Sequence, residues 1–263
     1  AEARDKLRLV AELRDAIDRR EISLTYQPIF CARSGAPVAV EALARWEHRE
    51  RGAISPVTFI PLAEESGLIA GLGLLVLDET CRQLAEWDQL LGSAAPPRAN
   101  VNVSALQLDD NLHAQVAAAL QRHGLAPSRI SVEITESALM KDPDSARGVL
   151  QQLRDLGVDL AIDDFGTGYS SLAYLRHLPV NCLKVDRSFV AELADGHAVI
   201  ASAVIALANN LNLSTVAEGV ETVEQAAELT ALGATYLQGF SLATPMTGGH
   251  AAAWFAAHGE IAR

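Results

Sequence analysis

The chain has 263 residues, 49% of them hydrophobic and 21% charged, which supplies ample apolar material for one large α/β domain. The net charge of −12 argues against a protein that coats a nucleic-acid polymer, because no basic face offsets the field. Three widely separated cysteines without a CxxC pair disfavour a zinc finger or a disulfide framework, and they favour reduced thiols in the cytoplasm.

No apolar run approaches the roughly 18 residues that a membrane span needs. We therefore expect no membrane contact within this segment, and no signal peptide. The sequence begins without an initiating Met, inside a helical pattern over residues 1–20. We interpret it as one domain, residues 1–263, of a longer protein, with a membrane anchor elsewhere in that protein left open.

Strand and helix patterns alternate along the chain. Strands are predicted at 22–29, 37–44, 99–103, 129–135, 158–163, 181–186, 213–217 and 234–238. Helices are predicted at 58–65, 72–91, 105–123, 144–156, 170–177, 197–211, 222–232 and 249–258. Eight strand–helix units in about 250 residues favour a (β/α)8 barrel, whose active sites lie at the carboxyl ends of its strands. A doubly wound sheet is the alternative, but no GxGxxG follows the first strand.

Six of the apolar strand-like runs end in a carboxylate or a carboxamide. The end residues are Glu41, Asn102, Glu133, the pair Asp163-Asp164, Asp186 and Glu218. If the strands are parallel, these residues share one rim, where adjacent carboxylates cannot all stay ionised without a cation. The rim therefore predicts a divalent-metal site with oxygen ligands.

Several polar or aromatic residues near the rim also have an ordinary structural interpretation. Arg45 could form a surface ion pair with Glu41, four residues earlier, and Asn102 could be a turn or cap residue. Asp186 could cap the helix that follows it, and Glu221 could be a first-turn helix carboxylate. Phe240 is by default a core residue.

The stretch DDFGTGYSSL, residues 163–172, is the strongest single signal. Consecutive aspartates at a strand end repel each other unless they share a cation, and the two glycines make the following loop flexible enough to act as a lid. Lys184 could enter the same acidic cavity and hold a water or a phosphate oxygen as a point charge. The seven histidines form no HExxH, which disfavours zinc chemistry and a Ser/His triad.

Together these motifs resemble an EAL-domain cyclic-di-GMP phosphodiesterase over essentially the whole chain. The resemblance runs from Tyr26-Gln27-Pro28-Ile29, through Glu41-Ala42-Leu43, to Gln238-Gly239 and Pro245. It implies a modified (β/α)8 barrel in a single domain. It also implies that a metal-activated water hydrolyses cyclic-di-GMP to linear pGpG, with two Mg²⁺ or Mn²⁺ ions as cofactors.

The resemblance further assigns roles to single residues. The first metal would be bound by Glu41, Asn102, Glu133 and Asp163. The second would share Asp163 and add Asp164, with Glu218 as a ligand or as the base near the attacking water. Catalysis would rest on Lys184, which positions that water, and on Glu218 and Glu41. The substrate pocket or its supports would comprise Gln27, Leu43, Arg45, Glu221 and Gln238. Glu136 would brace the lid loop, residues 165–172.

The sequence departs from the family pattern at two places and leaves two other functions open. His48-Arg49-Glu50 stands where His-Pro-Glu is common, and Thr244 precedes Pro245 where a basic residue is frequent. One alternative function is a non-catalytic EAL module that binds cyclic-di-GMP as a sensor, although such modules usually lose metal ligands and none is missing here. The other is a different divalent-dependent barrel enzyme, for example an enolase-like one. Because family members often pair through the lid-loop side, a homodimer is also open.

Overall fold

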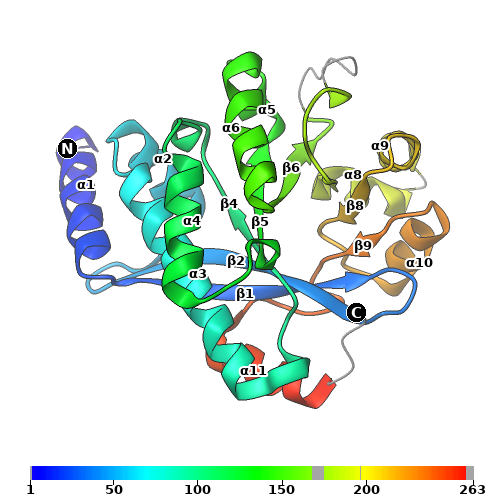
Figure 1. The fold of residues 1–263 in the computed structure, drawn as a ribbon, viewed down its shortest axis with the longest axis horizontal. Helices are drawn as coiled ribbons and strands as arrows, with labels where there is room; N and C mark the ends of the chain where they lie inside the picture. The colour runs from blue at the N-terminus through cyan, green and yellow to red at the C-terminus, as the bar shows by residue number, and fades with distance from the viewer. Residues whose placement is uncertain (1, 168–174, 196, 259–263) are drawn as a thin grey trace.

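The computed structural model describes residues 2–167, 175–195 and 197–258 (Figure 1). Eight strands close into a barrel: β1 (Ile22–Cys31), β2 (Pro37–His48), β4 (Ala99–Asn102), β5 (Ile130–Thr135), β6 (Asp159–Phe165), β7 (Cys182–Val185), β8 (Ser214–Ala217) and β9 (Tyr236–Leu237). The neighbours from β2 to β9 pair in parallel, whereas β1 pairs antiparallel with both β2 and β9. The expected modified (β/α)8 barrel is confirmed, and the reversed direction of β1 is its modification.

Two short strands extend the sheet beyond the barrel. β3 (Gly52–Ile54) pairs antiparallel with the end of β2, and β10 (Met246–Thr247) pairs antiparallel with β1. Neither was predicted, because runs of two or three residues are too short to show an alternating pattern. β2 is also four residues longer than its predicted range, since its outer end continues into the pairing with β3.

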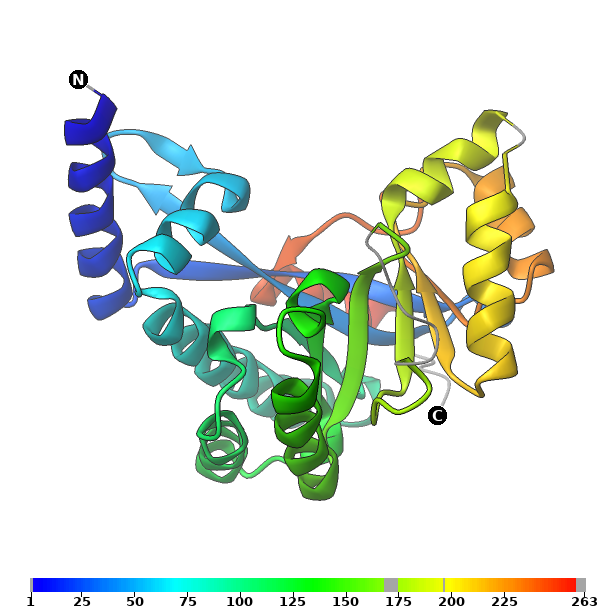
Figure 2. The ribbon, with the colours of Figure 1, turned by 90° about the horizontal axis from the view of Figure 1, so that it is seen from above.

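The helices form an outer layer around the strands. The long ones are α1 (Glu2–Asp18), α2 (Pro56–Glu65), α3 (Ile69–Leu91), α4 (Leu112–His123), α6 (Pro143–Leu156), α9 (Val199–Asn210), α10 (Val223–Ala231) and α11 (Gly248–His258). The short ones are α5 (Glu136–Leu139), α8 (Arg187–Ala191) and the 3-10 helices η1 (Gly92–Ala94), η2 (Ala105–Gln107), η3 (Pro127–Arg129) and η4 (Glu192–Asp195). Figures 1 and 2 show α1 on the opposite side of the molecule from α9 and α10.

The prediction of one helix over 105–123 was wrong. Ser104 caps only the 3-10 helix η2, where its hydroxyl accepts from the Leu106 N–H and its own N–H donates to the Gln107 side chain. The polar stretch that follows interrupts the helix, because the Asp109 carboxylate accepts a hydrogen bond from the Asn111 N–H and favours a turn. The predicted helix at 170–177 lies mostly outside the described residues.

α6 shows how the sequence forms a helix of the outer layer. The Asp142 carboxylate accepts from the Ser145 N–H at 3.3 Å and caps the helix start, which has Pro143 in its first turn. The helix ends at Gly157, whose φ of 98° favours glycine. Its buried residues follow the helical period: Ala146, Val149, Leu150 and Leu153. This apolar face packs α6 against the barrel.

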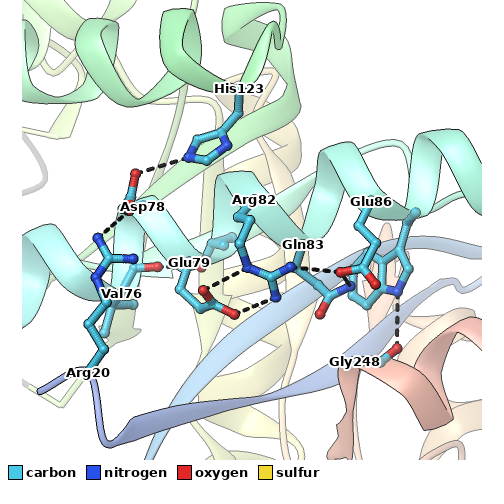
Figure 3. A network of polar contacts seen from close by, with 11 residues as sticks. Arg20, Val76, Asp78, Glu79, Arg82, Gln83, Glu86, His123 and Gly248 are labelled. Carbon is cyan, nitrogen blue, oxygen red and sulfur yellow. Dashed lines mark hydrogen bonds and ion pairs between the residues drawn. The ribbon is translucent and has the colours of Figure 1, made fainter.

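Polar contacts tie α3 to its neighbours (Figure 3). Asp78 accepts hydrogen bonds from Arg20 and Arg122 and contacts His123 Nε2 at 2.9 Å. Burial alone would raise the pKa of Asp78, but the hydrogen bonds from His123, Arg20 and Arg122 hold it well below its usual range. This cluster joins α3 to α4 and to the end of α1.

A second contact on α3 fixes the last helix. Trp87 Nε1 donates to the Gly248 carbonyl at 3.0 Å, at the start of α11, and α11 packs on α3 and β1. Between the two contacts, Arg82 forms ion pairs with Glu79 and Glu86 on the same helix.

Among the described helices, none is both long and apolar enough to cross a membrane.

Candidate active site at the rim of the barrel

A buried lysine lies at the centre of the acidic rim. Lys184 on β7 is 1% exposed, and its Nζ lies 2.7 Å from Glu133 Oε2 and 2.6 Å from Glu218 Oε1. The distances from Nζ to Asp163 Oδ1 and Glu41 Oε2 are 3.2 and 3.7 Å. Burial opposes the charged form, yet the surrounding carboxylates raise the pKa of Lys184 well above its usual value. The lysine is therefore a permanent positive charge among four carboxylates, which come from β2, β5, β6 and the residue after β8.

Strand register explains why Gln27 reaches this rim from a reversed strand. In the β1–β2 pairing Gln27 lies opposite Glu41. Gln238 Nε2 donates to Glu41 Oε2 at 2.8 Å and to Gln27 Oε1 at 3.3 Å, while Asn102 Nδ2 donates to Glu41 Oε1 at 2.8 Å. Burial alone would raise the pKa of Glu41, but Lys184, Gln238 and Asn102 lower it on balance. Glu41 is therefore held as a carboxylate with both oxygens engaged.

Glu133 is the most enclosed carboxyl group of the set. It is fully buried on β5, where Oε1 accepts from Asn100 Nδ2 at 2.7 Å and Oε2 accepts from Lys184. Burial raises its pKa to about 8, and the nearby Glu41 and Asp163 add to the shift, while Lys184 offsets part of it. Without a further positive charge, burial therefore favours the protonated form of Glu133.

Three further carboxylates gather on the open side of the rim. Oxygens of Asp163, Asp164 and Glu218 all lie within 4.8 Å of one another. Asp164 has a φ of 52°, in the left-handed region that aspartate tolerates better than most residues, and this turn directs it to the same place. Burial and Asp163 raise the pKa of Asp164 to about 6, and burial raises the pKa of Glu218 well above its usual value.

The donor set fits a divalent metal centre. All its ligand atoms are carboxylate or carboxamide oxygens, the type that hard cations such as Mg²⁺, Mn²⁺ and Ca²⁺ take. When ionised, the five carboxylates Glu41, Glu133, Asp163, Asp164 and Glu218 face the single positive charge of Lys184. Burial raises the pKa values of Glu133, Asp164 and Glu218, the neighbouring carboxylates raise them further, and added cations would offset this negative charge.

Two cavities adjoin the carboxylates. One of about 250 Å³ is lined by Gln27, Glu41, Asp163, Lys184, Arg187, Glu218, Gly219, Glu221, Gln238, Gly239 and Phe240. Leu43, Arg45 and Asn102 instead line a second cavity of about 430 Å³. The structure thus divides the predicted substrate-binding residues between two cavities, and the hydrogen bond from Asn102 to Glu41 links a lining residue of the larger cavity to one of the smaller.

Glu136 is buried beneath the start of the predicted lid loop. Its Oε2 accepts from the Gly166 N–H at 2.8 Å. Glu136 directly follows the predicted strand 129–135, and the Thr135 hydroxyl accepts from the Ala138 N–H and starts the short helix α5 at this point. Residues 168–172 of the predicted lid lie outside the described residues.

The structure also decides between the alternatives left open for single residues. Glu41 is 7% exposed, which excludes a surface ion pair with Arg45. Asp186 caps α8, since its carboxylate accepts from the Ser188 N–H at 3.0 Å. Glu221 precedes the first turn of α10, and its side chain is exposed toward the smaller cavity. Phe240 is 67% exposed, so the core interpretation was wrong.

Some residues of the site were not found from the sequence. Asn100, the hydrogen-bond donor to Glu133, lies two residues before Asn102, and the period of two in a strand could have placed both on the inner face. Gly239 is required by a close approach, because a Cβ there would lie 2.1 Å from the Val220 carbonyl oxygen. This contact holds Gln238 against the turn that follows β8.

Fold and site together define a closed barrel of seven parallel strands and one reversed strand, with an acidic centre suited to divalent cations. The chain belongs to the EAL domain family, whose sequence profile matches residues 10–245.

The similar proteins include signalling enzymes of Pseudomonas aeruginosa. The bifunctional diguanylate cyclase/cyclic di-GMP phosphodiesterase MucR is 50% identical over 249 residues, which are 94% of this chain and 36% of MucR. The cyclic di-GMP phosphodiesterase NbdA is 42% identical over 247 residues, 93% of this chain and 31% of NbdA. The chain therefore spans about a third of the length of these curated relatives. A solved structure of the PaMucR phosphodiesterase in complex with c-di-GMP has a TM-score of 0.88 and 48% identity, and the match covers 93% of this chain and 99% of that one.

Proposed function

We propose that this chain hydrolyses one phosphodiester bond of cyclic-di-GMP and releases linear pGpG. Its membership of the EAL family and its similarity to relatives named as cyclic di-GMP phosphodiesterases support this substrate. The single observation that carries the proposal is the arrangement around Lys184. Four carboxylates surround its ammonium group, and three of them, Glu41, Asp163 and Glu218, open onto a cavity.

Divalent cations complete the site in this proposal. Five carboxylates against one ammonium group leave an excess of four negative charges, which two Mg²⁺ or Mn²⁺ ions would balance. The ligands would be Glu41, Asn102, Glu133 and Asp163 for the first ion, and Asp163, Asp164 and Glu218 for the second. When bound, such ions lower the pKa of a water molecule and offset the charge of the phosphodiester.

Glu218 accepts the proton of the attacking water. Its carboxylate lines the smaller cavity, where the substrate would lie. The water oxygen forms the new bond to phosphorus, and the 3′ oxygen of the sugar leaves and takes up a proton, so the product carries a 5′ phosphate. Lys184 holds Glu218 and Asp163 in place, and Asn102 and Gln238 fix Glu41, so the geometry is set before the substrate arrives. Direct contact of Lys184 with the water stays a prediction.

The two cavities offer room for the two halves of a dinucleotide. Asn102 lines the larger cavity and Glu41 lines the smaller one, and the hydrogen bond between them places both beside the proposed reaction centre. Leu43 and Arg45 would contact one half of the substrate in the larger cavity, and Glu221 would contact the other half in the smaller cavity.

The test is a product assay. Purified chain is treated with EDTA, incubated with cyclic-di-GMP, and then given Mg²⁺ or Mn²⁺, with products separated by anion exchange and identified by mass. We expect pGpG only when the cation is returned. Binding of cyclic-di-GMP without any product would instead identify a sensor module, and the absence of binding would exclude both functions. A homodimer through the lid-loop side stays a prediction that sedimentation velocity would check.

A further inference from the structure

The smaller cavity has a second cationic side chain in its wall. Besides Lys184, its lining includes Arg187, the first residue of α8. Lys184 is already bound to carboxylates through contacts of 2.6, 2.7 and 3.2 Å, which match its three N–H donors. Arg187 is exposed, and among residues 2–167, 175–195 and 197–258 its guanidinium has no ion pair or hydrogen bond. Within the part of the chain that the structure describes, Arg187 is therefore a cation of the smaller cavity that is free to bind a ligand.

The position of Arg187 is set by its neighbours. Asp186 accepts from the Ser188 N–H at 3.0 Å and fixes the backbone turn that presents Arg187. On the other side, Gly219 has a φ of 67°, and a Cβ added there would lie 2.6 Å from the Cβ of Arg187. Only glycine leaves room for the arginine stem at this point. Arg187 is thus packed against the residue that follows Glu218, at the edge of the proposed reaction centre.

The proposed substrate needs such a cation. A cyclic dinucleotide contains two phosphodiesters, each with one negative charge, and only one of them can lie at the carboxylates when it is cleaved. In the smaller cavity the other would face a wall that contains Glu218 and Glu221, and these would repel it. An arginine fork can donate two parallel hydrogen bonds to one phosphate group, and such charge-assisted bonds are strong.

We propose that Arg187 binds the phosphodiester that is not cleaved, and that it thereby positions the reacting one over the carboxylates. This inference rests on the proposed function, and it adds a residue that selects substrates with two phosphate groups. Arg187 lies three residues beyond Lys184 and is exposed where Lys184 is buried, which puts it farther out along the cavity wall. It is a positioning residue that touches substrate away from the bond that breaks.

The experiment compares wild type with Arg187→Ala, Arg187→Lys and the control Arg14→Ala, an exposed arginine of α1 outside the cavity. For cyclic-di-GMP we expect Arg187→Ala to raise KM by about 10- to 100-fold and to change kcat less than about threefold. Arg187→Lys keeps the charge but loses the fork, so it should recover part of the loss. Linear GpG, which has a single phosphodiester, should inhibit wild type and Arg187→Ala equally well, within about threefold.

Each result decides for or against the role of Arg187. An unchanged KM in Arg187→Ala, or a loss confined to kcat, would overturn it. Equal weakening of cyclic-di-GMP and GpG would overturn it as well, since Arg187 would then serve the reacting phosphodiester. If GpG fails to inhibit wild type, the KM values alone decide, and if Arg187→Ala fails to fold, the KM of Arg187→Lys decides. Wild-type protein that leaves cyclic-di-GMP intact would instead overturn the proposed function itself, and the role of Arg187 with it.

Discussion

Glu133 gives the cation-free protein a stability that depends on pH. Burial raises the pKa of its carboxyl group from 4.5 to about 8 in the folded protein. Because the folded pKa lies above the unfolded one, the folded state keeps a proton that the unfolded chain releases. The contribution of Glu133 to the free energy of unfolding is therefore most favourable below pH 4.5, and it falls as pH rises toward 8.

The size of the effect follows from the width of this window. Each pH unit costs about 1.36 kcal/mol, so the loss from pH 6 to pH 8 is about 2.3 kcal/mol, given that Glu133 is half ionised at the upper limit. For a chain of this size that loss corresponds to a decrease of roughly 5–9 °C in melting temperature. A divalent cation next to Glu133 would offset the charge and remove most of the decrease.

The assay is thermal unfolding, followed by circular dichroism at pH 6, 7 and 8. The melting temperature of EDTA-treated wild type should decrease from pH 6 to pH 8, and saturating Mg²⁺ should remove most of this decrease. Glu133→Gln keeps the shape of the side chain but cannot titrate. In EDTA its free energy of unfolding should therefore fall from pH 6 to pH 8 by about 2.3 kcal/mol less than that of wild type. Parallel curves for the two proteins in EDTA would refute the assignment of a buried, proton-binding carboxyl group to Glu133.

Three other substitutions test separate parts of the structure. Asp164→Asn should keep the Kd for cyclic-di-GMP within roughly tenfold of wild type, or about 1.4 kcal/mol, and should reduce turnover by orders of magnitude. Calorimetry and product analysis on one sample measure the two quantities. Parallel losses of binding and turnover would contradict the assignment of two ions. Glu136→Ala removes the acceptor of the Gly166 N–H, so hydrogen exchange over 163–167 should rise and activity should fall, with partial rescue by excess Mg²⁺. Full loss of activity with unchanged exchange would mean that Glu136 acts in the chemistry itself. Asp78→Asn should lower stability by about 1–3 kcal/mol near neutral pH. Because the pKa of Asp78 is depressed, this difference should shrink as pH falls below about 3.8, and chemical denaturation at several pH values would show a constant difference if the reasoning is wrong.

The location of the site could be predicted from the sequence because it depends on strand ends. In parallel strands the carboxyl ends meet at one rim, so Glu41, Glu133, Asp163 and Glu218 had to approach one another once the strands were recognised. Glu136 is a different case. Its contact with the Gly166 N–H depends on a helix of four residues that carries too little periodic signal to predict.

Other features depend on tertiary contacts that no local pattern encodes. An alternating strand pattern does not specify the direction of pairing, so the reversal of β1, which puts Gln27 opposite Glu41, could not be derived from residues 22–29 alone. Phe240 is exposed beside Gly239, whose close approach to Val220 is a contact between the turns after the neighbouring strands β9 and β8. The period of two in a strand could have placed Asn100, the donor to Glu133, on the same face as Asn102, but the sequence interpretation did not include it.

The most direct measurement is the rate of pGpG release as Mn²⁺ is titrated into EDTA-treated protein, for wild type and for Glu41→Ala. We expect wild type to show no release in EDTA and to recover with Mn²⁺. Glu41→Ala should stay at least about 1,000-fold slower at every Mn²⁺ concentration, while circular dichroism shows the same folded barrel. Release of pGpG by wild type in EDTA, or near wild-type turnover by folded Glu41→Ala, would contradict the claim that the carboxylates of the rim and divalent cations together cleave cyclic-di-GMP.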